Sequence, residues 1–226
     1  MMYIDNNMSD SKQELRARFS GLRKSIPAAA AEKLSARIAQ NIFSLPRLLD
    51  SDMVMVYCRT GAEVDTASLI DIIASSGRAV AFPHCRDDGS MGVGRVFSPR
   101  DDLAPGPLGT FEPVDRLKDN VSALQLGAVV CPGVAFDAQG GRLGRGGGHY
   151  DRFLRWIRGK VLIIGCAYDC QISETPLPGE EHDVPMDVVI TEKRAFPEGS
   201  CPALILQPEN VAGSNYTGGK KSDGAA

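Results

Sequence analysis

The sequence predicts an α/β fold, with a mostly parallel sheet, helices on both faces and a Rossmann-like three-layer architecture. Two observations carry this prediction. Short apolar runs that read as buried strands recur along the chain, and amphipathic stretches with helical spacing separate them. Strands that alternate with helices favour a parallel sheet, because each crossover helix packs back onto it. The apolar runs are 53–58, 79–82, 127–131, 161–167 and 188–191.

The chain begins with two predicted helices. Residues 12–24 place Leu15, Phe19 and Leu22 at helical spacing among basic residues. Pro27 is a typical first residue of a helix, and the second helix is expected to run from there toward Phe43.

The middle of the chain alternates as an α/β fold requires. A helix is expected over 66–75, followed by the strand 79–82, which we expect to end at Pro83. Residues 86–120 are rich in Gly, Pro and Asp and hold one expected strand near 93–97.

Length and composition limit the class of protein. The 226 residues fit one domain, expected over 12–208, with disordered tails at 1–11 and 209–226, where apolar content is low. A net charge of −3 gives no basic field for nucleic acid, and no apolar run is long enough for a membrane helix. The polar N-terminus and six cysteines without a Cys-x-x-Cys pair fit a cytoplasmic protein, which we expect to be a monomer.

The most informative segment is the glycine loop, which we define as residues 140–151. It holds six glycines and two arginines, ends in His149-Tyr150-Asp151, follows the strand 127–131 and precedes an expected helix over 150–158. Its backbone N–H groups, with a helix N-terminus behind them, would form a cradle for an anion. No lysine follows the glycines as in a P-loop, and the dinucleotide fingerprint fits poorly, which disfavours an NAD- or CoA-using enzyme.

The loop is similar to the signature of the 5-formyltetrahydrofolate cyclo-ligase family. Further segments resemble that family in the same order along the chain, over about residues 12–191. The segments are Lys12-Gln13-Glu14-Leu15-Arg16, Glu63-Val64-Asp65-Thr66, Phe82-Pro83, Gly133-Val134-Ala135-Phe136-Asp137 and Glu181-His182-Asp183-Val184-Pro185-Met186-Asp187.

The resemblance implies an enzyme that uses ATP and Mg²⁺ to close 5-formyltetrahydrofolate to 5,10-methenyltetrahydrofolate, with release of ADP and phosphate. It implies two steps: the formyl oxygen attacks the γ-phosphate, and N10 then displaces phosphate from the resulting N5-iminium phosphate. The protein would act mainly by positioning and charge neutralisation, so no cysteine is assigned a catalytic role.

The resemblance also implies roles for individual residues. Asp151 and Asp183 would hold Mg²⁺, whereas Asp187 is a weaker candidate because it begins the last expected strand. Arg145, His149 and Tyr150 would contact the reacting groups. The nucleotide would be bound by Lys12, Gln13, Glu14, Leu15, Arg16, Arg142, Leu143, Gly144, Arg145, Gly146, Gly147, Gly148, His149 and Tyr150. The folate would be bound by Cys58, Glu63, Arg145, Gly146, Gly147, Gly148 and His149.

The chain departs from the family pattern at three positions. His149 stands where members commonly have Tyr, Gly147 where some have Lys, and His84 where many have a basic residue; Arg86 or Arg95 would then be a substitute for that charge. Two alternatives therefore stay open at this point: a related nucleotide-binding protein without cyclo-ligase activity, and a non-catalytic folate-binding module.

Overall fold

The structure is a computed structural model that describes residues 11–107 and 109–201. The expected disordered tails, apart from Ser11, and the end of the expected domain at residue 208 lie outside this range. No helix in the described ranges is long and apolar enough to cross a membrane.

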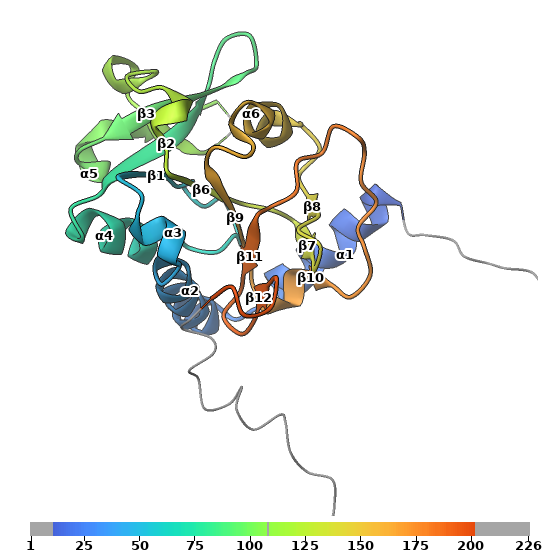
Figure 1. The fold of residues 1–226 in the computed structure, drawn as a ribbon. Coiled ribbons are helices and arrows are strands. Elements are labelled where there is room, and N and C mark those ends of the chain that lie inside the picture. Colours follow the sequence, from blue (N-terminus) through green and yellow to red (C-terminus); the bar gives the residue numbers. More distant parts are fainter. Residues whose placement is uncertain (1–10, 108, 202–226) are drawn as a thin grey trace, which may run out of the picture.

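A seven-stranded sheet forms the centre of the molecule, in the order β12-β11-β9-β6-β1-β2-β3 (Figure 1). The five inner strands pair in parallel, and only the two edge pairs, β11 with β12 and β2 with β3, are antiparallel. The predicted α/β fold is therefore confirmed. The strands are β1 (Met53–Met55), β2 (Ala79–Cys85), β3 (Met91–Val96), β6 (Ala128–Cys131), β9 (Leu162–Cys166), β11 (Val188–Ile190) and β12 (Ala195–Phe196).

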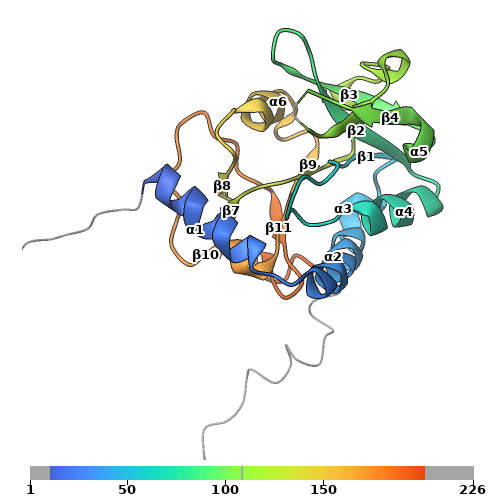
Figure 2. The ribbon, with the colours of Figure 1, turned by 180° about the vertical axis from the view of Figure 1, so that it is seen from behind.

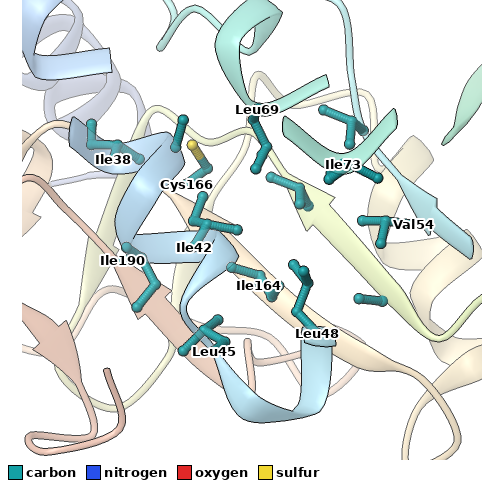
Figure 3. Close-up of a cluster of buried hydrophobic side chains, with 14 of the residues drawn as sticks. Ile38, Ile42, Leu45, Leu48, Val54, Leu69, Ile73, Ile164, Cys166 and Ile190 are labelled. Carbon is teal, nitrogen blue, oxygen red and sulfur yellow. The ribbon is translucent and has the colours of Figure 1, made fainter. Parts of the chain in front are cut away.

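Helices cover both faces of this sheet, as the alternating apolar strands require. Val54, Val130 and Ile164 belong to one buried cluster, and their neighbours along the strands belong to a second cluster on the opposite face. The first cluster packs under α2 (Ala28–Phe43), α3 (Pro46–Leu49) and α4 (Ala67–Ser75) (Figure 3). The second cluster packs under α6 (His149–Ile157).

A small second sheet carries the N-terminal helix. β7 (Ala135–Asp137) lies between β8 (Arg142–Leu143) and β10 (Ile172–Ser173), and α1 (Lys12–Lys24) runs along it (Figure 2). Leu15 and Phe19 of α1 are buried against this sheet. Ser11 and Glu14 form a capping box that begins α1 at the predicted residue.

The segment that was expected to be mostly irregular holds further short elements. β4 (Leu103–Pro105) and β5 (Phe111–Pro113) pair as an antiparallel ribbon, and β5 lies beside β2. The remaining elements are α5 (Pro99–Asp102) and the 3-10 turns η1 (Asp115–Leu117), η2 (Ala123–Gln125) and η3 (Asp169–Gln171).

The structure corrects the predicted end of one strand and the predicted course of the glycine loop. β2 continues through Pro83 to Cys85, because β1 pairs with it only as far as Ala81 and a proline is tolerated where a strand has one neighbour. The glycine loop does not follow β6 directly, because β7 lies between them, and two residues of the loop, Arg142 and Leu143, form β8. Its helix begins at His149, one residue before the predicted start.

Candidate active site

A cavity of about 340 Å³ opens where the parallel strands end, the edge at which α/β sheets bind ligands. Tyr57 and Cys58 follow β1, Pro132 and Gly133 follow β6, and His84 lies near the end of β2. The predicted residues that line this cavity are Lys12, Arg16, Cys58, Glu63, Arg142, Leu143, Gly144, Arg145, Gly146, Gly147, Gly148, His149, Tyr150, Asp151 and Asp183.

Three residues of the predicted nucleotide motif do not line the cavity. Gln13 and Glu14 are exposed on α1, and Leu15 is buried against the small sheet. Glu14 instead accepts hydrogen bonds from the Ser11 backbone and hydroxyl, which hold the pKa of its carboxyl below the ordinary value. Helical geometry explains why only Lys12 and Arg16 of this motif line the cavity, because they lie one turn apart on the same face of α1.

Positive φ angles shape the glycine loop just before α6. Gly146 has φ +107°, and Gly148, the N-cap of α6, has φ +63°. Residues other than glycine rarely adopt positive φ angles. The His149 ring packs beside Gly147, where an added Cβ would lie 2.8 Å from the ring carbon Cδ2. The chain differs from the family pattern at both Gly147 and His149, and these two residues are in contact.

His149 also joins the loop to the hairpin between β2 and β3. Its Nδ1 lies 3.0 Å from the carbonyl oxygen of Gly89, and the Nη2 atom of Arg152 lies 3.5 Å from the same oxygen. The departure from tyrosine thus places a ring nitrogen against a loop that is distant in sequence.

Arg142 and Asp151 form a mostly buried ion pair under the loop, with Nη2 and Oδ1 2.6 Å apart. The Arg142 guanidinium also stands 5.5 Å from the centre of the Tyr150 ring. The Tyr150 hydroxyl oxygen is buried without a hydrogen-bond partner, and burial raises the pKa of this phenol well above its ordinary value. Tyr150 is therefore a neutral hydrogen-bonding group.

Arg145 reaches across the cavity to Glu63, the residue that the sequence predicts to bind the folate. Its Nη2 donates to Oε1 of Glu63 over 2.7 Å and also contacts the Thr60 hydroxyl. The Glu63 side chain is 8% exposed, whereas that of Arg145 is 54% exposed. Thr60 donates its backbone N–H to Oε2 of Glu63 over 2.8 Å, so the carboxylate is held from two directions.

Lys12 and Arg16 bring α1 to the other side of the cavity. Arg16 donates from Nε to the carbonyl oxygen of Gly144 over 2.9 Å. Lys12 pairs with Glu180 at 2.7 Å and with Asp183 at 3.4 Å. The hydrogen bond that Lys12 donates to Glu180 is the main reason that the pKa of Lys12 is raised, so this ammonium is charged at neutral pH.

The two predicted magnesium ligands line one cavity, although each forms an ion pair with a neighbouring cation. Arg155, one turn beyond Asp151 on α6, donates to the carbonyl oxygen of His182 over 3.3 Å, which ties the Asp183 segment to α6. Within residues 11–107 and 109–201, no group of three or more His, Cys, Asp or Glu residues is arranged to hold a metal ion. Two carboxylates suit Mg²⁺, which usually keeps several waters and shares the phosphates of its substrate. Asp187 accepts from the backbone N–H of Ile163 and belongs to the sheet.

The sequence did not single out several residues of the cavity wall. Glu112 of β5, Thr60 and Glu180 line it, and no motif surrounds them. His84 lines it as well, but neither substitute cation does: Arg86 binds Asp119 over 2.6 Å, and the Arg95 guanidinium stacks on Phe97. Cys58 lines the cavity as predicted, and burial raises the pKa of its thiol to about 11.

Comparisons with known proteins place the chain in a family. A model of the 5-formyltetrahydrofolate cyclo-ligase family matches residues 8–192. The chain is 30% identical over 177 residues to the 5-formyltetrahydrofolate cyclo-ligase of Escherichia coli K12, covering 77% of this chain and 96% of that one. It is 28% identical to the enzyme of that name in Mycolicibacterium smegmatis, over 82% and 96% of the two chains.

Solved structures agree with the fold. The 5,10-methenyltetrahydrofolate synthetase of Aquifex aeolicus superposes with a TM-score of 0.71 at 35% identity, covering 82% of this chain and 91% of that one. A synthetase of that name from Mycoplasma pneumoniae has a TM-score of 0.63 at 19% identity, over 81% and 100% of the two chains, and supports the fold alone. The chain therefore belongs to the 5-formyltetrahydrofolate cyclo-ligase family, a family of ligases.

Proposed function

We propose that this chain converts 5-formyltetrahydrofolate to 5,10-methenyltetrahydrofolate at the expense of ATP. Family membership supports the reaction. The observation that carries the assignment to this cavity is the meeting of α1, the glycine loop and Glu63. Arg16 contacts Gly144 across 128 positions of sequence, and Arg145 contacts Glu63 across 82.

ATP is proposed to bind with its phosphates at the cationic side of the cavity. Lys12, Arg16 and Arg142 supply positive charge there. Lysine offers a compact charge and arginine a forked pair of donors, both suited to phosphate oxygens. The N-terminus of α6, behind Gly148, adds free backbone N–H groups.

The folate is proposed to bind beside Glu63 and Cys58, with its formyl group toward Arg145. The formyl oxygen attacks the γ-phosphorus, the bond from that phosphorus to ADP breaks, and ADP leaves. N10 of the resulting N5-iminium phosphate then attacks the activated carbon and gives up its proton, and the carbon–oxygen bond to phosphate breaks. Arg145 is well placed to stabilise the transferred group, because it links the loop to Glu63.

Asp151 and Asp183 are proposed to hold Mg²⁺, which would neutralise charge that develops on the phosphate oxygens. To do so, each carboxylate must exchange its present cation partner, Arg142 or Lys12, for the ion. The released arginine and lysine would then be free to contact the nucleotide.

The test is a direct assay of the purified full chain. With 5-formyltetrahydrofolate, ATP and Mg²⁺, we expect near-ultraviolet absorbance of the methenyl product to rise, with one ADP formed per product. Omitting ATP, or replacing it by an analogue whose β–γ bridge cannot be cleaved, should abolish the signal. A folded protein that yields no product would refute the proposed activity.

A further inference from the structure

One end of the cavity, away from the phosphate-binding cations, has a buried polar wall that the proposed mechanism does not use. It is formed by the ends of β2 and β3 and by the β4–β5 ribbon. Its members include His84, Cys85, Met91, Phe111 and Glu112.

Glu112 is the unusual member of this wall. Its residue is only 4% exposed, and its Oε2 atom is buried without a hydrogen-bond partner. Its other oxygen accepts from the Thr110 hydroxyl over 3.4 Å, a long hydrogen bond. The Cys85 thiol also faces this carboxylate, and its pKa is raised first by burial and then by the Glu112 charge. A buried carboxylate with an unmet oxygen is costly, so such a group calls for a partner that the free protein lacks.

The surrounding backbone makes room for this side chain. An added Cβ at Gly106 would lie 2.4 Å from the Glu112 carboxyl carbon, so only glycine leaves the carboxylate its present position. His84 shows the same arrangement: it is 3% exposed, its Nδ1 has no hydrogen-bond partner, and an added Cβ at Gly92 would lie 2.3 Å from its Nε2. Glu112 and His84 thus each bring a buried polar atom without a hydrogen-bond partner to this wall of the cavity.

The chemistry of the wall selects the part of a ligand that would bind there. Met91 and Phe111 offer apolar surface to a flat ring, and a carboxylate accepts from ring N–H donors rather than from anions. A terminal carboxylate oxygen turns readily about its last side-chain bond, so either Glu112 oxygen can face the cavity. A phosphate or a carboxylate tail would instead be repelled by Glu112.

We infer that Glu112 is a second specificity-determining carboxylate for the folate, which accepts from the adjacent N–H and NH₂ donors of the pterin ring. This inference rests on the proposed function. Glu63, whose oxygens are held by Arg145 and Thr60, is the other carboxylate proposed to contact the folate.

The test measures binding rather than turnover. Titration calorimetry gives the Kd of 5-formyltetrahydrofolate and, separately, of ATP with Mg²⁺, for the wild-type chain and for Glu112→Gln. We expect the folate Kd to rise at least about tenfold, as the loss of a charge-assisted hydrogen bond predicts, and the ATP Kd to change less than about twofold. The matched control is Glu32→Gln, an exposed glutamate on α2, which should leave both unchanged.

A fragment pair separates the ring from the tail. We expect 6-methyltetrahydropterin to lose affinity for Glu112→Gln, whereas p-aminobenzoylglutamate should bind both proteins alike. An unchanged folate Kd in a folded variant, or an equal loss for folate and ATP, would overturn the inference. If Glu112→Gln does not fold, Gly106→Ala, which displaces the carboxylate without changing charge, decides by the same criteria. A wild-type chain that binds no folate would contradict the proposed function itself, whereas normal binding by Glu112→Gln would contradict only this inference.

Discussion

Arg145 is the residue whose removal should affect the reaction most directly, because its guanidinium is half-exposed in the cavity and links Glu63 to the glycine loop. For Arg145→Ala we expect kcat/KM to fall at least tenfold, since a charge-assisted hydrogen bond to the transferred phosphoryl contributes about 1.5 kcal/mol or more. The unfolding midpoint should change little. Steady-state kinetics of Arg145→Ala and of the exposed control Arg100→Ala measure the effect. If Arg145→Ala has wild-type kinetics, Arg145 does not contact the transferred phosphoryl group.

The substitution of Asp151 tests whether this residue is a magnesium ligand. For Asp151→Asn we expect turnover to fall and half-saturating Mg²⁺ to rise by about tenfold or more, because the amide is a weaker ligand for a hard cation. Titrating the rate with Mg²⁺ measures both effects. Asp71→Asn, an exposed carboxylate on α4, is the control. If the magnesium titration is unchanged, Asp151 is not a metal ligand and only its ion pair with Arg142 remains.

The rate at which the Cys58 thiol is alkylated should depend on pH. Burial raises the pKa of its thiol to about 11, so the reactive thiolate is scarce near pH 8. We expect iodoacetamide to modify Cys58 slowly at pH 8, with a rate that rises about tenfold per pH unit until it levels off near pH 11. Peptide mass spectrometry measures the rate, and bound 5-formyltetrahydrofolate should protect the thiol. Rapid modification at pH 8 would contradict this burial.

At the scale of elements, α1 is attached to the rest of the molecule through a few apolar side chains and carries two cations, Lys12 and Arg16, that are proposed to bind phosphate. Phe19 is 2% exposed against the small sheet, whereas Leu22 of the same helix is 42% exposed. For Phe19→Ala we expect a loss of about 3–5 kcal/mol in the free energy of unfolding, together with a higher KM for ATP. Urea unfolding and ATP kinetics test this against Leu22→Ala, and equal effects of the two substitutions would refute this packing.

Sequence reasoning was most reliable for elements with strong periodicity or caps. The apolar repeat of α1 gave residues 12–24, which are its bounds in the structure, and Pro27 marked the beginning of α2. It failed where pairing, not propensity, decides: β7, β8 and β10 are strands of two or three residues that exist because they lie beside one another. Pro83 was misjudged for the same reason, since its tolerance depends on where β1 ends.

For the whole molecule, the site is assembled from segments that the sheet brings together over more than 160 positions, as the Lys12–Glu180 contact illustrates. The glycine loop could be predicted from its own glycines and arginines. Lys12, Arg16 and Glu63 were predicted only because the segments around them resemble those of the family. Glu112 could not be predicted, because its burial and its unmet oxygen arise only when the β4–β5 ribbon folds beside β2.

We expect the domain to unfold in one transition that shifts as a unit when ligands bind. ATP with Mg²⁺ at a hundred times its Kd should stabilise the native state by about 2.7 kcal/mol, which corresponds to a rise of roughly 5–10 °C in Tm. Scanning calorimetry with and without EDTA measures the shift and the share due to the metal. Two separate transitions, or no shift at saturating ligand, would contradict this description.

The ion pairs around the cavity have a consequence for how ligands enter and leave. Lys12 faces Glu180 and Asp183, Arg142 faces Asp151, and Arg145 faces Glu63, so the unliganded protein supplies its own counter-ions. If the proposed ligand sites are right, binding would be an exchange of ion-pair partners. Phosphates would displace the carboxylates from these cations, and the freed carboxylates would contact a metal or ring N–H groups. In the proposed reaction, the protein's own carboxylates could pair again with each cation after ring closure, and this return would favour release of ADP and phosphate.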